Sequence, residues 1–140
     1  MHKMTIMNSK NSDKRIPAVN FRYIVTDIDA TVHFYVEMLG FHSEMHVKGD
    51  FAILSLGGPR LFINRPGAGG AGQAMPDGIV PAPGGWNRIQ IMVDDLEKIV
   101  TDLKNKGAGF RNEIVTGVGG RQILLQDPSG NLVELFQPPE

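Results

Sequence analysis

The sequence carries one pattern twice, and this repeat constrains the fold more than any other feature. An alternating apolar segment comes first and ends in an acidic turn, with Asp27 in the first copy and Asp95 in the second. A stretch with apolar residues at helical spacing follows and stops at Gly40 and at Gly107. The acidic landmarks are 68 residues apart and the glycines are 67 apart. Two landmarks at nearly the same offset indicate an internal duplication.

The repeat predicts the same order of elements in each copy. Alternation predicts a strand over residues 20–25 and another over 88–93. Helices are expected over 29–39 and 96–106, each ended by the glycine that follows it. Three shorter strands are predicted after each helix, over residues 43–48, 51–56, 60–65, 109–115, 120–126 and 131–136.

These elements divide the chain into four parts. Residues 1–17 show no periodicity and are predicted to be a flexible N-terminal arm, with an ordered arm on a dimer partner as the alternative. Residues 18–66 form the first βαβββ module and residues 86–138 the second. Between them, residues 67–85 are rich in Gly and Pro and are predicted to be either a linker or a lid over a cavity.

The predicted fold class is α+β, with two βαβββ modules whose curved mixed sheets enclose a cavity. Each module buries one face of its sheet under its helix and leaves the other face uncovered. Strand alternation assigns the side chains of that second face. They are Asn20, Arg22, Ile24, Arg88, Gln90, Met92, Leu132, Glu134 and Phe136.

Three segments then resemble a known family. They are residues 25–28 followed by 33–35 and 38–41, the echo at 92–96, and above all Gln126 to Phe136, which reads QDPSGNLVELF. This pattern is similar to the vicinal oxygen chelate superfamily, which includes glyoxalase I, extradiol dioxygenases and bleomycin-resistance proteins. The resemblance covers residues 19–137. It implies the fold strongly and the reaction weakly, since one scaffold hosts several chemistries.

The resemblance also implies where a metal would bind. Metal-dependent members place ligands on the first and last strands of each module. The matching positions here are Asn20, Arg88, the segment 62–64, and Glu134. Only Glu134 is a good ligand, because an amide oxygen coordinates weakly and a guanidinium cannot coordinate at all.

Arg88 and Glu134 are predicted to lie on neighbouring strands and to form an ion pair. The pair either replaces the metal structurally or presents Arg88 to an anionic ligand. Trp86 either stacks on a flat ligand or fills the gap where the loop rejoins the sheet. Arg22 either faces the cavity or is a solvated strand residue.

Other candidates are weaker. His42 and His46 are four residues apart on a predicted strand, which separates them by roughly 13 Å and argues against one shared metal ion. The segment 117–121 is Gly-rich but opens no helix, so it is predicted to be a hairpin turn and not a nucleotide-binding loop.

Composition excludes several classes of function. The chain has no cysteine, so thiolate catalysis and zinc-thiolate sites are excluded. The formal net charge is −1 and no long basic run occurs, so no nucleic-acid partner is expected. No apolar run approaches the ~20 residues that a membrane span needs. A cytoplasmic location and a homodimer are the expectations.

Two functional hypotheses follow. In the favoured one, the protein binds a small anionic or oxygen-rich molecule without a metal, and no cofactor is needed. The ligand-binding residues would be Asn20, Arg22, Trp86, Arg88, Gln90, Met92 and Phe136. In the alternative, it is a lyase or dioxygenase in which Glu134 and Asn20 hold Zn, Fe, Mn or Ni. Glu134 is the catalytic candidate, as a ligand or as a metal-free general base.

Overall fold

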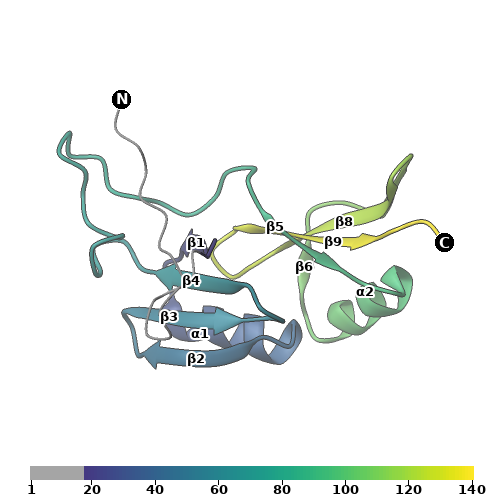
Figure 1. The fold of residues 1–140 in the computed structure, drawn as a ribbon, viewed down its shortest axis with the longest axis horizontal. Helices are drawn as coiled ribbons and strands as arrows, with labels where there is room; N and C mark the ends of the chain where they lie inside the picture. Colours follow the sequence, from purple (N-terminus) through teal and green to yellow (C-terminus); the bar gives the residue numbers. More distant parts are fainter. Residues whose placement is uncertain (1–17) are drawn as a thin grey trace, which may run out of the picture.

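The computed structural model describes residues 18–140, and the predicted arm at 1–17 lies outside the described residues. Two sheets lie side by side, one from each half of the chain (Figure 1). The first half contributes β1 (Phe21–Ile24), α1 (Ile28–His33), η1 (Phe34–Met38), β2 (His42–Val47), β3 (Phe51–Ser55) and β4 (Arg60–Asn64). The second contributes β5 (Ile89–Met92), α2 (Leu96–Asn105), β6 (Gly109–Phe110), β7 (Val115–Gly117), β8 (Gly120–Gln126) and β9 (Leu132–Gln137).

Strand order is the same in both halves. The first sheet runs β1-β4-β3-β2 and the second runs β5-β9-β8-β6, with β7 added to β8. In each sheet the first strand pairs in parallel with the last strand of its module, and the remaining neighbours are antiparallel. This repeated topology confirms the predicted α+β fold with two βαβββ modules.

The landmarks of the repeat have the same structural role in each copy. The Asp27 carboxylate accepts a hydrogen bond from the Ala30 amide at 3.0 Å and caps α1, while the Asp95 carboxylate caps α2 through Lys98 at 3.1 Å. Such caps satisfy amides that have no partner within the helix. Gly40 and Gly107 have φ angles of 79° and 89°, which a side chain would disfavour.

The first helix differs from its prediction. Residues 29–39 were expected to form one α-helix, but the α-helical part ends at His33 and Phe34–Met38 form a π-helix. Phe34 and Tyr35 are consecutive and both are buried, and the rings of Tyr35 and Phe41 meet edge to face at 5.3 Å. A π-helix has more residues per turn than an α-helix, so consecutive side chains point in more similar directions. Phe34 and Tyr35 can therefore both point toward the core.

The prediction of one continuous strand over residues 109–115 is also wrong. Only Gly109–Phe110 pairs with β8, and pairing resumes at Val115. Between them the side chain of Asn112 accepts the Leu124 amide at 3.0 Å, so a side chain takes the place of a backbone acceptor. The hairpin turn predicted within 117–121 is confirmed, since Gly117 pairs with Gly120.

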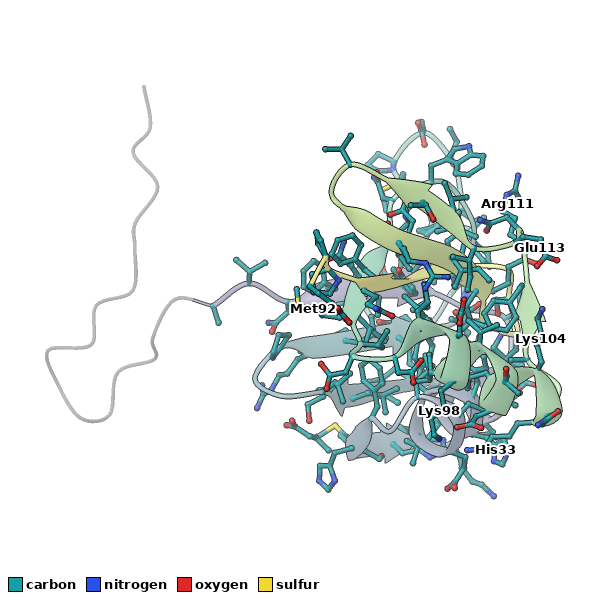
Figure 2. The ribbon with its side chains drawn as sticks, turned by 90° about the vertical axis from the view of Figure 1, so that its right-hand side faces the viewer. His33, Met92, Lys98, Lys104, Arg111 and Glu113 are labelled. Carbon is teal, nitrogen blue, oxygen red and sulfur yellow. The ribbon has the colours of Figure 1, made fainter. Side chains whose placement is uncertain are left out.

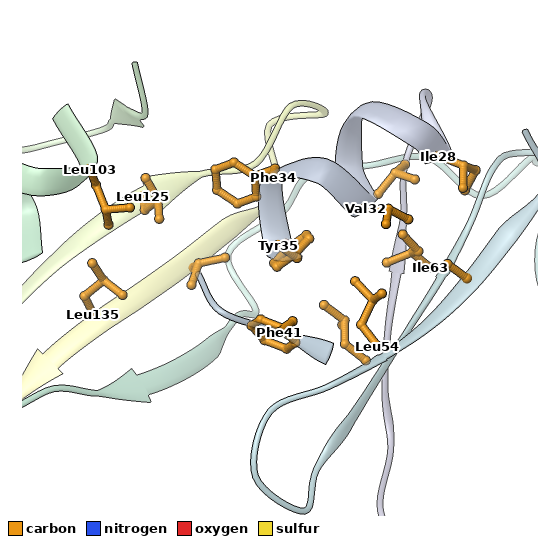
Figure 3. Packing of buried hydrophobic residues seen from close by; sticks show 14 of the residues in the cluster. Ile28, Val32, Phe34, Tyr35, Phe41, Leu54, Ile63, Leu103, Leu125 and Leu135 are labelled. Carbon is orange, nitrogen blue, oxygen red and sulfur yellow. The ribbon is translucent and has the colours of Figure 1, made fainter. Parts of the chain in front are cut away.

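One continuous core extends through both modules (Figure 3). Leu54 and Ile63 are fully buried under α1, and Leu125 and Leu135 are fully buried beside Leu103 of α2. Tyr35 lies between these two groups and is also fully buried.

Hydrogen bonds across the junction hold the two modules together within one chain. The Tyr23 hydroxyl on β1 donates to the Leu132 carbonyl at 2.7 Å and accepts the Ile89 amide at 2.8 Å. β1 and β5 are the terminal strands of their sheets. One phenol therefore bridges two sheet edges that no backbone ladder joins.

The turn before β9 supplies the second set of contacts. Its Asp127 carboxylate accepts the Tyr35 hydroxyl at 3.0 Å and the Asn131 amide at 2.9 Å. The Asn131 side chain donates to the Ile24 carbonyl at 2.9 Å, and the Ser129 hydroxyl accepts the Thr26 amide at 2.8 Å. The turn thus docks on the first module through both side-chain and backbone groups.

The helices are short. Across residues 18–140, no helix has the length and apolar character that crossing a bilayer requires.

We expect Tyr23→Phe to lower the free energy of unfolding by about 2 kcal/mol, because the Ile89 amide and the Leu132 carbonyl both lose their partner. Urea denaturation measures this change. Thr101→Val is the control, since its hydroxyl bonds only the Glu97 carbonyl on an exposed helix face. Equal stability of the Tyr23 variant and the control would show that the bridge is energetically neutral.

A second prediction concerns alkaline pH. The chain has two tyrosines. Burial raises the phenol pKa of Tyr23 to about 12 and that of Tyr35 well above its ordinary value. A phenol pKa raised by folding contributes stability that is intact below the unfolded value of 10 and is lost as the pH rises toward 12. At about pH 11, phenolate absorbance should be small in the folded protein and large in urea. Equal absorbance in both states would contradict this.

Candidate functional site

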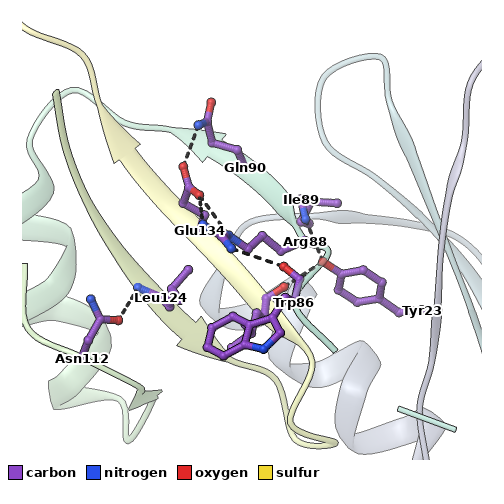
Figure 4. A network of polar contacts seen from close by, with 9 residues as sticks. Tyr23, Trp86, Arg88, Ile89, Gln90, Asn112, Leu124 and Glu134 are labelled. Atoms are coloured by element: carbon purple, nitrogen blue, oxygen red, sulfur yellow. Dashed lines mark hydrogen bonds and ion pairs between the residues drawn. The ribbon is translucent and has the colours of Figure 1, made fainter. Parts of the chain in front are cut away.

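The position of Glu134 in β9 places its carboxylate beside β5, and this carboxylate organises the site (Figure 4). Its Oε1 accepts a hydrogen bond from Arg88 Nε at 3.0 Å, and Arg88 Nη2 lies 2.8 Å from the same oxygen in the ion pair. Its Oε2 accepts one from the Gln90 side-chain amide at 2.6 Å. The carboxyl side chain is 8% exposed, so the charge is largely removed from water and needs these donors. The predicted Arg88–Glu134 ion pair is confirmed.

Arg88 also bonds the chain that leads into β5. Its Nη1 donates to the Trp86 carbonyl at 3.3 Å. The indole of Trp86 is 62% exposed, and the Arg111 guanidinium lies over its ring at 4.5 Å. Trp86 therefore lies at the surface against Arg111, and it does not fill a gap in the core.

The first module has a different set of side chains at the equivalent places. Gln90 pairs with Glu134 across β5 and β9, and Arg22 pairs with Phe62 across β1 and β4. Phe62 thus occupies the position of Glu134, and the Arg22 guanidinium lies over its ring at 5.2 Å. Arg22 also donates to the Asn64 side chain, whose residue is 5% exposed. An aromatic ring stands where a second carboxylate would be required.

A cavity of about 500 Å³ opens where the two modules meet. One wall is Arg88 and the edge strand β5 that follows it, Ile89–Met92. The opposite wall comes from the first module and consists of Phe21, Phe41, Leu56, Gly57, Pro59, Arg60 and Leu61.

The predicted ligand-binding residues fall into two groups. Arg88, Gln90 and Met92 line the cavity, and Met92 lies at the molecular surface with 65% of its area exposed (Figure 2). Asn20, Arg22, Trp86, Glu134 and Phe136 do not line it. Of these, Glu134 contacts the wall residues Arg88 and Gln90, and Asn20 is exposed just before β1. The loop at 67–85, which the structure describes throughout, contributes no lining residue.

Sequence reasoning missed the wall from the first module. Phe21 alternates with Arg22 and so falls outside the face predicted to line the cavity, yet it is 44% exposed and lines the cavity with Ile89 and Ile91. β1 is an edge strand, so Phe21 has a neighbour within the sheet on one side only. Strand alternation carries no signal for this, because it does not show how two sheet edges meet.

The residues at the family's metal positions do not fit a divalent metal. Glu134 is the one carboxylate, and both of its oxygens already accept hydrogen bonds. The other positions hold an amide at Asn20, a guanidinium at Arg88 and a phenyl ring at Phe62. Within residues 18–140, no three His, Asp or Glu side chains gather as a metal site. These positions therefore do not supply a complete ligand set for a divalent metal ion.

The chain is similar to known proteins in sequence and in fold. Residues 15–135 match the family model described as Glyoxalase/Bleomycin resistance protein/Dioxygenase superfamily. A curated relative is the virulence protein STM3117 of Salmonella typhimurium (strain LT2), 28% identical over 117 residues that cover 81% of this chain and 78% of that protein. The crystal structure of that relative aligns with a TM-score of 0.68 at 24% identity, covering 89% of this chain and 99% of that one.

Two further crystal structures share the fold. A lactoylglutathione lyase from Agrobacterium tumefaciens aligns with a TM-score of 0.66 at 18% identity and covers 88% of this chain and 96% of that one. TnmS3, an antibiotic binding protein from Streptomyces sp. CB03234, aligns with a TM-score of 0.61 at 22% identity and covers 88% of this chain and 98% of that one. At these identities the likeness concerns the fold alone.

We expect the Arg88–Glu134 pair to show strong energetic coupling. Glu134→Gln and Arg88→Met should each lower the free energy of unfolding by about 3 kcal/mol, since each leaves a poorly hydrated charge without its partner. The double variant should cost clearly less than the sum. The exposed pair Arg121–Glu97, 2.8 Å apart, is the matched control and should couple by less than about 1 kcal/mol. Urea denaturation of all variants measures both couplings, and equal coupling in the two pairs would contradict a special role for the first.

Proposed function

The chain belongs to the Glyoxalase/Bleomycin resistance protein/Dioxygenase superfamily, and from this premise we propose that it binds a small, anionic or oxygen-rich molecule without a metal ion. The binding site is the cavity between the modules, with Arg88, Gln90 and Met92 on one wall. Glu134 fixes the orientation of the first two side chains and is buried behind them.

The observation that carries the proposal is the set of residues found at the positions where metal-dependent members of the family hold their metal ligands. A guanidinium occupies one of these positions, and its charge is balanced by the one remaining carboxylate at 2.8 Å. Both oxygens of this carboxylate are occupied by Arg88 and Gln90, so neither is free for a cation, and N–H donors remain on the cavity side of β5. Donors of this kind suit oxygen-bearing ligands.

The size and lining of the cavity support a small molecule. A volume of about 500 Å³ lies within the range of sites for drug-sized ligands. Most lining residues are apolar, and the charged or amide side chains are Arg88 and Gln90 on the β5 wall and Arg60 on the opposite wall. The ligand is therefore an apolar body that carries a polar or charged group.

The alternative, a lyase or dioxygenase that holds a divalent metal through Glu134 and Asn20, has less support. Both oxygens of Glu134 would have to leave Arg88 and Gln90 before they could coordinate. Breaking a buried ion pair costs about 3–5 kcal/mol, which metal binding would have to exceed.

A homodimer is part of the proposal, as is a cytoplasmic location. All six residues of the edge strand β2 are exposed, including the apolar Met45 and Val47. An exposed edge strand with apolar side chains is suited to contact a second copy.

Binding of the fluorescent dye anilinonaphthalenesulfonate, an aromatic anion, tests the function. We expect saturable binding of one dye per chain that neither EDTA nor added Zn, Fe, Mn or Ni changes. Phe21→Ala should weaken binding about fivefold, since it removes an aromatic wall worth about 1 kcal/mol. Ile79→Ala is the control, because Ile79 is also an exposed apolar residue but does not line the cavity.

Elemental mass spectrometry of protein grown with the same metals completes the test. Metal well below one equivalent supports the proposal. Near-stoichiometric metal, or dye binding that EDTA abolishes, would contradict it and favour the metal-dependent alternative. Dye binding that the two variants weaken equally would place the dye outside the cavity.

A further inference from the structure

A second guanidinium, that of Arg60, lines the same cavity from the opposite side. Arg60 is the first residue of β4 and follows the turn at Gly57–Pro59, whose residues also line the cavity. It therefore faces β5 across the space between the modules. No motif or periodicity in the sequence distinguishes this arginine from the others.

The two guanidiniums differ in how far their hydrogen-bonding capacity is already used. Arg88 donates two hydrogen bonds within the chain, from Nε to the Glu134 carboxylate and from Nη1 to the Trp86 carbonyl, and its Nη2 lies 2.8 Å from the same carboxylate. Its charge is balanced by a carboxylate that is only 8% exposed and cannot readily move into water. Arg88 can offer N–H groups to a ligand, but its positive charge is already neutralised.

Arg60 has one charged partner among the described residues, Glu44, at 3.2 Å. The two side chains are 51% and 32% exposed. Exposed pairs of this kind are weak, because water solvates both charges when they separate. A ligand anion can therefore replace Glu44 at little cost.

The backbone places Glu44 at this position by an irregularity in the sheet. On β2, Ser43 pairs with Leu54 and Met45 pairs with the adjacent Ile53, so Glu44 is an extra residue without a partner on β3. Such a β-bulge redirects a side chain out of the regular alternation. Here it brings a carboxylate to the arginine at the edge of the cavity.

The wall around Arg60 is apolar. Phe21, Phe41, Leu56, Pro59 and Leu61 all line the cavity on this side. A ligand that reaches Arg60 from the cavity thus buries an apolar body against aromatic and aliphatic side chains. Its charged group has to stand at one end of that body.

We propose that Arg60 is the residue that recognises the anionic group of the ligand, and that Glu44 competes with the ligand for it. The ligand class is an apolar, preferably aromatic, molecule with one carboxylate, sulfonate or phosphate group. This inference rests on the proposed function, because it assigns the charge selectivity of the same cavity. Arg60, and not Arg88, then recognises the negative charge of the ligand. Arg88, whose charge is balanced by Glu134, and Gln90 offer N–H groups from the opposite wall.

Two dyes with the same aromatic skeleton test this assignment, anilinonaphthalenesulfonate and the uncharged phenylnaphthylamine. Arg60→Gln should weaken sulfonate binding about tenfold, the usual size of one lost charge-assisted contact, and leave the uncharged dye unchanged. Glu44→Gln should strengthen sulfonate binding about threefold, because it removes the competitor. Added NaCl should weaken sulfonate binding to the wild-type protein and have less effect on Arg60→Gln.

Arg65→Gln is the matched control. Arg65 follows the last residue of β4, has a similarly exposed ion pair with Asp50 at 2.9 Å, and does not line the cavity. It should change neither dye's affinity. Circular dichroism melts verify that each variant is folded.

The outcomes separate this inference from the proposed function. If Arg60→Gln lowers the affinity of both dyes equally, or of neither, or if Glu44→Gln does not strengthen sulfonate binding, Arg60 is not the anion-recognising residue. In those cases Phe21→Ala still weakens both dyes and the cavity remains a binding site. If no dye shows saturable, Phe21-dependent binding, the proposed function itself fails.

Discussion

The hydroxyl of Tyr23 joins two sheet edges that would otherwise face each other without hydrogen bonds, and the geometry of the cavity depends on this junction. Its bonds to Ile89 and Leu132, at 2.8 and 2.7 Å, fix the start of β5 and the start of β9 relative to β1. Asn131 and Ser129 extend the junction by binding the backbone of Ile24 and Thr26. Because β5 forms one wall of the cavity and the first module forms the other, a shift at this junction would change the width of the site.

The charges of the site are arranged in two layers with different accessibility. Glu134 and Arg88 form an inner pair whose carboxylate is almost fully buried. Breaking this pair is expected to affect the stability of the fold, even though Arg88 also lines the cavity. Glu44 and Arg60 form an outer pair that is open to water. A buried ion pair of this kind stabilises the shape of the site, whereas an exposed ion pair can exchange one partner for a ligand. Ligand selectivity can therefore change at the exposed pair while the fold is kept.

Much of the fold could be predicted because each local signal agreed with the others. The duplicated landmarks Asp27 and Asp95 and the strand alternation are local features, and they predicted the modules, while the resemblance to the superfamily placed Arg88 and Glu134 on neighbouring strands. The cavity could not be predicted in the same way. Alternation shows on which face of a strand a residue lies, but it does not show how two sheet edges meet, and Arg60 reaches the site only through that meeting. The bulge at Glu44 and the side-chain acceptor at Asn112 also depend on partner strands that sequence periodicity does not reveal.

The junction contacts join residues that are far apart along the chain. Tyr23 and Leu132 are separated by 109 positions, and Thr26 and Ser129 by 103. During synthesis the first module therefore emerges from the ribosome long before the segment that completes its edge. Loops of this length close slowly compared with local helices and hairpins, so docking of the second module is expected to be a late event in folding. Until then the Tyr23 hydroxyl, the Ile24 carbonyl and the Thr26 amide lack their partners from the second module. The order in which the two halves are made thus sets a period in which the first module exists without the contacts that hold its edge strand in place.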